Sequence, residues 1–362
     1  VETYIERPAV YDLLEACFAM EYTYVLAPRQ IGKSSLVARV VVDLAGQGYK
    51  TAIVDLNSIG VEVTNEEWYF GLLTEICRDL DLLVTLGEWW GQQFEPISMA
   101  QRFMRFVREI LLPRISERIV IFIDEIDNTL GLSFTDDFFA AIRTLYNDRV
   151  KYSELDRLAF VLIGVVTADK LIKDPNRTPY NVGRPIDIRD FALAECEPFR
   201  NVLNKRFAPG QASALLERVF YWGNGHPLIT QGLCHILGEL HLSLDPAVSS
   251  ESVIDSQVDS ILNPESPRKR DEITDHFDHV DSRIRADDRF GQMLGIYERI
   301  LNGKDVTDDI KSSSVNRLKV HGLVIQQGRG LRTRNRIYER KFDRAWVKES
   351  RPPDYTRTGL RI

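Results

Sequence analysis

The chain has 362 residues, of which 44% are hydrophobic and 27% are charged, with 22 glycines and 15 prolines. This is the composition of a globular protein, so collagen-like, disordered and disulfide-scaffold classes are excluded. The length predicts two or three domains, each large enough to bury its own core. The sequence has no apolar run of the roughly 18 residues that span a membrane and no export signal, so we expect a cytoplasmic protein without a membrane partner.

Charge is distributed unevenly along the chain. The formal net charge is −7, yet residues 311–362 carry 14 Lys and Arg against 4 Asp and Glu, or +10, which leaves 32 against 49, or −17, for the first 310 residues. The acidic balance argues against generic binding to nucleic acid. Two interpretations of the basic end stay open: it binds an anionic partner, or it docks on the acidic remainder.

The first half of the sequence alternates strand and helix patterns. Apolar runs rich in β-branched residues predict buried strands at 22–26, 51–56, 119–123 and 158–166, with a weaker fifth at 185–188. Helical spacing is found at Ser35–Leu44, from Trp68 to Leu80 after the capping sequence TNEE, and at Ala100–Leu111. This alternation predicts a mostly parallel sheet that is covered on both faces.

The strand pattern ends at about residue 190. Helical segments follow to about residue 262, and 263–270 is typical of a linker. The rest predicts a helix at Phe290–Leu301, a helix and a strand in SSSVNRLKVHGLVIQQ, a Gly-Arg-Gly turn, and a second strand in LRTRNRIYERKF. Helix, helix, strand, turn and strand in this order indicate a winged helix.

The segment from Ala27 to Ser35 reads A-P-R-Q-I-G-K-S-S and lies between a predicted strand and a predicted helix, where a phosphate-binding loop is expected. Gly32 would let backbone N–H groups approach phosphates, Lys33 would reach the β and γ phosphates, and Ser34 would ligate magnesium. Ala27 departs from the glycine that begins the pattern G-x-x-x-x-G-K-[ST], and a Gly-ended turn with a solvated lysine is the alternative. The candidate nucleotide-binding residues here are Arg29, Gln30, Ile31, Gly32, Lys33, Ser34 and Ser35.

A second element follows where the apolar run IVIFI ends in Asp124-Glu125-Ile126-Asp127. A carboxylate at the tip of a buried strand costs free energy unless a metal or hydrogen-bond donors satisfy it. Asp124 would therefore hold magnesium through water, and Glu125 would orient or deprotonate an attacking water. Acidic residues also follow strands in ordinary loops, but this pair and the loop at 27–35 stand in the expected order. Together they predict binding of ATP or ADP with magnesium.

Further positions fit an additional-strand NTPase of the AAA-related class. Thr167 ends the run LAFVLIGVV, where it would contact the γ-phosphate or merely cap the next turn. Arg177 and Arg184 are candidate cations for the γ-phosphate, although surface arginines are usually solvated. Gly225-His226-Pro227 opens a predicted helix, where Pro227 would cover the base or phosphates or be an ordinary proline at a helix start.

Several strings along the chain carry a family resemblance: YIERPAVYDLL, YVLAPRQIGKSSLVAR, IVIFIDEID, DDFFAAIRTLYN, LIGVVTADKLIKDPNRTPYNVGRPI, GNGHPL and NRIYERKF. The sequence resembles the bacterial AAA-like-domain branch of the STAND NTPases, signal-transduction ATPases with numerous domains. The resemblance implies effector or sensor modules in the same full-length chain, buried ADP in an inactive state, and exchange for ATP with formation of a homo-oligomer. It also implies that YIERP lines the adenine pocket through Tyr4, Ile5 and Arg7, for which core packing is the alternative.

The expected fold class is an α/β P-loop NTPase domain, with a parallel sheet and helices on both faces, followed by a helical lid and a winged helix. The expected boundaries are 1–192 for the nucleotide-binding domain, 193–264 for the lid, 265–350 for the winged helix and 351–362 for a tail or linker. The expected function is an ATP- and magnesium-dependent switch core of a signalling or defence regulator, with slow ATP hydrolysis.

Two alternatives stay open beside the switch. One is a DNA-binding ATPase of the origin-recognition or transposition-regulator kind, which would use the basic residues of the wing at Arg329, Arg332, Arg334 and Arg336. The other is a scaffold that keeps its nucleotide and in which Glu125 is only an ion-pair partner. We expect the basic wing to dock within the protein and to bind duplex DNA weakly, with His321 as a candidate contact to the nucleotide phosphates.

Overall fold

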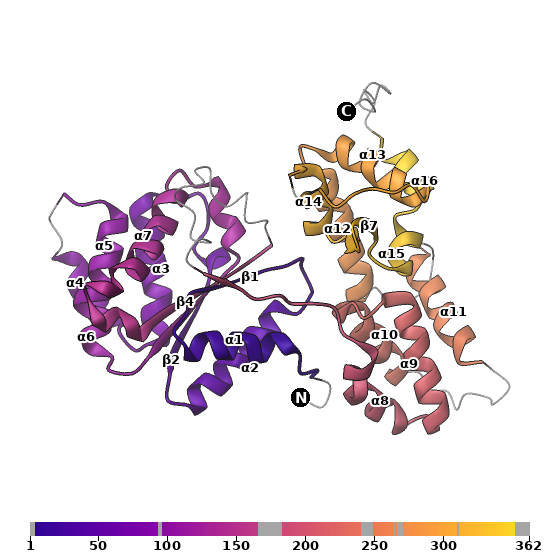
Figure 1. Ribbon diagram of the computed structural model, residues 1–362, viewed down its shortest axis with the longest axis horizontal. Coiled ribbons are helices and arrows are strands. Elements are labelled where there is room, and N and C mark those ends of the chain that lie inside the picture. The colour runs from indigo at the N-terminus through magenta and orange to yellow at the C-terminus, as the bar shows by residue number, and fades with distance from the viewer. Residues whose placement is uncertain are drawn as a thin grey trace. The chain divides into compact units, whose positions relative to one another are not determined.

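The computed structural model describes residues 4–92, 96–165, 183–239, 249–263, 265, 271–309 and 311–351. The chain divides into two compact units (Figure 1). The sheet unit comprises 8–27 and 33–188, and the helical unit comprises 1–7, 28–32 and 189–362. The expected lid and winged helix fall in the same unit. Within the described part of the chain, no helix combines the length and the apolarity that crossing a membrane requires.

A five-stranded parallel sheet forms the centre of the sheet unit, with strand order β2-β3-β4-β1-β5. The strands are β1 (Thr23–Leu26), β2 (Lys50–Asp55), β3 (Ile119–Asp124), β4 (Leu158–Gly164) and β5 (Arg184–Pro185). All five predicted strands are therefore present, and the fifth is short and begins one residue early. Strand β4 is inserted between β1 and β3, so the strand that enters the loop at 27–35 is not adjacent to the strand that ends at Asp124.

Helices cover both faces of the sheet, as predicted (Figure 1). One face carries α1 (Pro8–Phe18) and α2 (Lys33–Gly46), and the other carries α3 (Asn65–Asp79), α5 (Met99–Phe106) and α7 (Thr135–Asn147). Among the described residues of this unit, the other helical segments are α4 (Leu83–Gly91), a π segment at Val107–Leu111, α6 (Leu112–Arg114), and 3₁₀ turns at Leu56–Ser58, Ile126–Gly131, Asp148–Val150 and Ser153–Arg157.

Local sequence signals explain where these helices begin and which face they bury. The TNEE sequence forms a capping box, because the Thr64 side chain accepts from the Glu67 N–H and the Glu67 carboxylate accepts from the Thr64 N–H. The buried face of α3 contributes Trp68, which packs edge-on against Phe138 of α7 at a centroid distance of 5.0 Å. Aromatic packing of this kind fixes α3 and α7 against the same face of the sheet.

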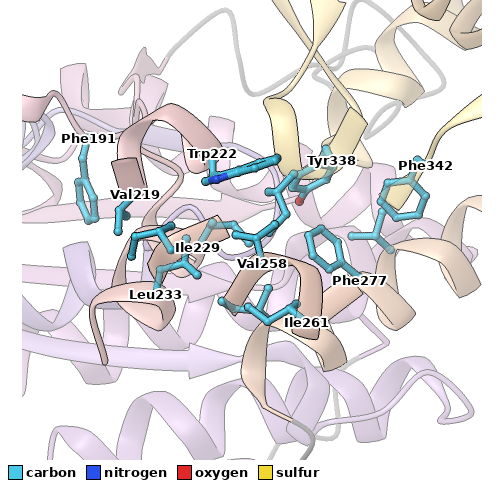
Figure 2. Close-up of a cluster of buried hydrophobic side chains, with 14 of the residues drawn as sticks. Phe191, Val219, Trp222, Ile229, Leu233, Val258, Ile261, Phe277, Tyr338 and Phe342 are labelled. Carbon is cyan, nitrogen blue, oxygen red and sulfur yellow. The ribbon is translucent and has the colours of Figure 1, made fainter. Parts of the chain in front are cut away.

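The helical unit contains the 3₁₀ turn Leu193–Cys196, α8 (Glu197–Asn204), α9 (Pro209–Gly223), α10 (Pro227–Glu239), α11 (Ser250–Leu262), α12 (Glu272–Arg285), α13 (Phe290–Leu301), α14 (Ser313–Val320), the antiparallel strands β6 (Val324–Gln327) and β7 (Gly330–Thr333), α15 (Arg336–Lys341) and α16 (Arg344–Glu349). One buried cluster runs from Phe191 to Val347 through this unit. Figure 2 shows Phe191, Ile229 and Phe342 within it. The expected lid and winged helix therefore share a single hydrophobic core.

The predicted wing is shorter than expected. Helices α13 and α14 and the hairpin β6–β7 are present, but the segment after β7 turns into helix α15 instead of continuing as strand. Asn335 begins the helix, because its side chain accepts from the Tyr338 N–H at 3.1 Å, and Ile337 and Tyr338 are buried. Arg336 and Arg340 consequently lie on a helix and not on a wing strand.

Candidate nucleotide-binding site

The loop at 27–35 connects the end of β1 to the start of α2. The Ala27 N–H donates to the Gly164 carbonyl of β4 at 3.2 Å, and α2 begins at Lys33. Lys33 is only 7% exposed, and its Nζ donates to the Ala27 carbonyl at 3.1 Å, so the ammonium group folds back across its own loop. Positive φ angles occur at Gln30 (59°) and Gly32 (93°) but not at Ala27. The loop geometry therefore needs no glycine at position 27.

Arg7 holds the backbone of loop residues 31 and 32, which belong with it to the helical unit. Its Nη1 donates to the Ile31 carbonyl at 2.6 Å and its Nη2 to the Gly32 carbonyl at 3.0 Å. A Cβ on Gly32 would stand 2.6 Å from Arg7 Nη2 and would displace the Arg7 guanidinium, and the φ angle of 93° independently favours glycine here. The family resemblance implies that YIERP lines an adenine pocket, but the guanidinium of Arg7 contacts loop carbonyls. Ile5 belongs to the core of the helical unit, and Tyr4 is half-buried.

Asp124 lies at the carboxyl end of β3, directly opposite Asp55 at the end of β2. Its Oδ1 accepts from the Glu125 N–H at 2.8 Å. Burial raises the pKa of Asp124, the Glu125 N–H and Lys33 lower it, and the nearby carboxylates of Asp55 and Asp127 raise it further. The pKa of Asp124 is raised overall, which means that the surrounding donors and positive charge do not fully stabilise its ionised carboxylate.

The turn after Asp124 is held in a defined shape. Glu125 has a φ of 57°, a left-handed conformation that costs a non-glycine residue about 1 kcal/mol or more. Asp127 Oδ1 accepts from the Val165 N–H at 3.0 Å, beyond the end of β4, and Asn128 Nδ2 donates to Asn57 Oδ1 at 2.6 Å, beyond the end of β2. Contacts to both neighbouring strands therefore fix the position from which Glu125 projects.

The chemistry of these groups fits a magnesium ion. Magnesium prefers hard oxygen ligands and is commonly held by one or two carboxylates together with phosphate oxygens. The carboxylate of Asp124 stands among Asp55 and Asp127, and the hydroxyl of Ser34 lies exposed in the first turn of α2. The ligands that would hold the ion are Ser34 and Asp124.

The structure corrects the prediction for Arg184, and two other predicted positions lie outside the residues that it describes. Arg184 pairs in register with Thr23 at the start of β1, at the opposite end of the sheet from the loop. Its guanidinium binds Glu15 at 2.8 Å and approaches Glu21 at 3.5 Å, so it is not a γ-phosphate contact. The sequence prediction failed because the strand register, which cannot be seen in the sequence, decides at which end a residue lies. Thr167 and Arg177 lie outside the described residues.

Two predicted contacts lie in the helical unit with protein partners of their own. Gly225 has a φ of 78° and its carbonyl accepts from the Phe191 N–H at 2.8 Å, so the Gly-His-Pro turn packs on the backbone of residue 191. Pro227 is buried and begins α10. His321 Nε2 is 3.0 Å from Asp287 Oδ2, in an ion-pair arrangement.

Sequence reasoning missed a buried polar network in the helical unit. Arg334, which was grouped with the exposed basic residues of the wing, is 3% exposed and donates to Asp190 at 2.7 Å. Beside it, His276 shares a hydrogen bond with Tyr338, and His226 is 1% exposed. Burial lowers the pKa of His276 to about 3, with smaller contributions from the charges of Arg334 and His279. Nothing local in the sequence separates Arg334 from the solvated arginines around it.

Comparisons with known proteins identify the family of the chain. The AAA-like domain family matches residues 2–344. A WD repeat-containing protein of Synechocystis sp., itself described as uncharacterized, is 35% identical over 358 residues, which make up 96% of this chain and 29% of the relative. This chain therefore spans less than a third of that relative's length.

One solved structure shows the same fold. A Walker-type ATPase of Pyrococcus abyssi is 14% identical with a TM-score of 0.56, and the match covers 93% of this chain and 95% of that one. A STAND protein with a tetratricopeptide repeat sensor from Pyrococcus horikoshii is also 14% identical, with a TM-score of 0.42 and coverage of 97% and 44%. The chain belongs to the AAA-like domain family and has the fold of a P-loop ATPase.

Proposed function

We propose that the chain binds ATP or ADP with magnesium and works as the nucleotide-dependent switch core of a STAND-type signalling or defence regulator. The observation that carries the proposal is the combination of a buried lysine in the loop after β1 with a carboxylate pair at the tip of β3, in a sheet where β4 is inserted between these strands. Lys33 would neutralise phosphate charge, and the N-terminal end of α2 would add its partial positive charge.

The proposed hydrolysis uses groups at the end of β3. Magnesium, held by Asp124 and Ser34, would supply charge neutralisation to the β and γ phosphates. Glu125 would orient the attacking water and accept its proton. The hydrogen bonds that hold the turn after β3 support this role, because they fix the position from which Glu125 projects. We propose slow turnover, as expected of a switch.

The switch itself needs further parts of a longer protein. The relative from Synechocystis sp. carries WD repeats by its name, which supports sensor modules in the same full-length chain. Exchange of ADP for ATP would then favour an active homo-oligomer in the cytoplasm, because a ligand shifts the balance of two states only by binding them unequally. Pro227 and His321 are further proposed nucleotide contacts, and His321 would have to exchange Asp287 for a phosphate.

DNA binding by the basic C-terminal region is the less favoured alternative. Arg334 binds Asp190, Arg336 donates to the Tyr221 carbonyl at 3.2 Å and Arg340 binds Asp259 at 2.7 Å, so three of the basic residues have partners inside the helical unit. These contacts support docking within the protein. A DNA titration at two salt concentrations tests this, because phosphate contacts give an affinity that falls steeply with salt.

Calorimetric titration of ATP and ADP with magnesium tests the binding proposal. We expect Lys33→Ala to lose about 10- to 100-fold in affinity, since it removes a charge-assisted contact from a partly desolvated site. Lys151→Ala is the matched control, because Lys151 is 72% exposed and pairs only loosely with Asp148. Undiminished affinity in Lys33→Ala would refute the assignment of the loop.

Phosphate release tests hydrolysis separately from binding. Wild type should release phosphate slowly, and Glu125→Gln should lose that release while keeping nucleotide affinity. If wild type releases none and the substitution changes nothing, the chain is a scaffold that keeps its nucleotide.

A further inference from the structure

We propose that Arg7 is a positioning residue of the phosphate-binding loop, and that a buried chain of charges from Arg7 through Asp190 to Arg334 couples this loop to the β6–β7 hairpin. The inference rests on the proposed nucleotide binding and concerns how that site is regulated. Arg7, Asp190 and Arg334 belong to the helical unit, as do the loop residues 28–32 whose carbonyls at 31 and 32 Arg7 binds.

The first step is the orientation of two peptide groups. In a trans peptide, the carbonyl of one residue and the N–H of the next point in opposite directions. Arg7 binds the carbonyls of Ile31 and Gly32, and it therefore turns the N–H groups of Gly32 and Lys33 away from itself. These N–H groups belong to the part of the loop that would cradle phosphates. Arg7 would thus preorganise the loop without touching the nucleotide.

Second, burial and packing against Phe191 hold Arg7 in place. It is 3% exposed, and its guanidinium lies 5.4 Å from the centre of the Phe191 ring. Phe191 is fixed in turn by Gly225, because a Cβ there would stand 2.0 Å from the Phe191 carbonyl oxygen. Figure 2 shows Phe191 beside Val219 in the core of this unit. The Gly-His-Pro turn therefore supports the residue that covers Arg7.

The third step links this region to the hairpin. Asp190 lies next to Phe191 in sequence, whose ring faces the Arg7 guanidinium; Asp190 itself forms an ion pair with Arg334 and lies within the electrostatic range of Arg7. Its ion pair with Arg334 is largely buried, with 19% and 4% of the two side chains exposed. The Arg334 N–H donates to the Leu323 carbonyl at 2.9 Å, next to the start of β6. A buried charge costs free energy unless an opposite charge stays beside it. A shift of the loop that moves Arg7 therefore changes the electrostatic energy of Asp190 and of its ion pair with Arg334, which lies next to the hairpin.

The experiment measures ADP affinity and hydrogen exchange in the full chain. The test variants are Arg7→Lys and Arg334→Lys, which keep the positive charge but lose the planar guanidinium with its two parallel donors. The control is Arg218→Gln, which breaks an ion pair with Asp255 in the same unit. We expect Arg7→Lys to bind ADP about tenfold more weakly and to lose the ADP-induced protection of the Gly32 and Lys33 amides. Arg334→Lys should lose the ADP-induced change in exchange of residues 324–333, and Arg218→Gln should behave as wild type.

Lys33→Ala, measured in parallel, separates failure of this inference from failure of the proposed function. If wild type binds ADP and Lys33→Ala does not, but Arg7→Lys keeps both the affinity and the amide protection, the positioning role is wrong. If wild type shows no ADP-induced change in residues 324–333, the coupling is wrong. If wild type binds no ADP at all, both the proposed function and this inference are wrong. Should Arg7→Lys not fold, Arg334→Lys tests the coupling alone.

Discussion

Two carboxylates, Asp124 in the sheet unit and Asp190 in the helical unit, both have a pKa that burial raises, yet they stand in opposite surroundings. Asp124 is flanked by the carboxylates of Asp55 and Asp127, against the single ammonium of Lys33. Asp190 binds the guanidinium of Arg334 and lies near two more arginines, Arg7 and Arg332. One site holds excess negative charge, whereas the other supplies its own counter-ions.

We propose that this difference separates a site for a ligand from a structural ion pair. A half-buried carboxylate among like charges is unfavourable by itself, and a bound cation would relieve it. A carboxylate surrounded by arginines needs nothing further from solution. The same type of residue with the same direction of pKa shift therefore has different roles, and the charges around it decide which.

The largest effect should come from removing Asp190. Asp190→Ala leaves the guanidinium of Arg334 buried without its partner, which should cost about 3–5 kcal/mol of unfolding free energy. Urea denaturation measures this loss. In the control Asp259→Ala, loss of the exposed ion pair with Arg340 should lower the unfolding free energy by less than about 1 kcal/mol. Equal losses in the two variants would mean that the Asp190 pair is no more structural than a surface pair.

Acid should destabilise the helical unit through its buried histidines. Burial holds the pKa of His226 well below its usual range and that of His276 at about 3, and the charge of Arg334 adds to both shifts. The unfolded chain therefore takes up these protons first, so stability falls as the pH drops below about 6.5, and His276 alone contributes a loss of about 2 kcal/mol at pH 5. The raised pKa of Asp190 acts in the opposite direction.

Urea denaturation between pH 7 and 5 measures the slope of this decline. His276→Gln should reduce the slope by about half, since one of the two buried imidazoles is gone. His235→Gln, which changes a largely exposed side chain, is the control and should leave the slope unchanged. A stability that is flat from pH 7 to 5 would contradict the neutral, buried state of both histidines.

The smallest effect has the opposite sign and concerns Asp124. Asp124→Asn removes one charge from a cluster of like charges and keeps an oxygen that can accept from the Glu125 N–H. We expect the nucleotide-free protein to gain up to about 1 kcal/mol of stability. A loss of more than 1 kcal/mol of unfolding free energy would contradict this prediction and would mean that Asp124, like Asp190, stabilises the fold.

Features set by neighbouring residues could be predicted from the sequence. The strands follow from runs of β-branched residues, the start of α3 from its capping box, and the loop between β1 and α2 from the G-K-S-S string after a strand. The beginning of α15 was missed, although Asn335 is of a residue type that often caps a helix. Only the buried positions of Ile337 and Tyr338 decide in favour of the helix.

Features set by distant partners could not be predicted. Arg7 and Gly32 are 25 residues apart in sequence, and Asp190 and Arg334 are 144 apart. Arg184 was misplaced because only the register between β1 and β5 shows that it lies at the end of the sheet away from the loop. Such contacts depend on tertiary packing, which residue type and local spacing do not encode.

The central claim is that the carboxylates at the tip of β3 need a cation, and the magnesium dependence of ATP affinity tests it most directly. ATP is titrated into wild type and Asp124→Asn, each with magnesium and with a chelator. The account predicts that magnesium tightens ATP binding by wild type about tenfold or more and changes binding by Asp124→Asn little, since the ion loses a carboxylate ligand. Equal tightening by magnesium in both proteins would contradict it.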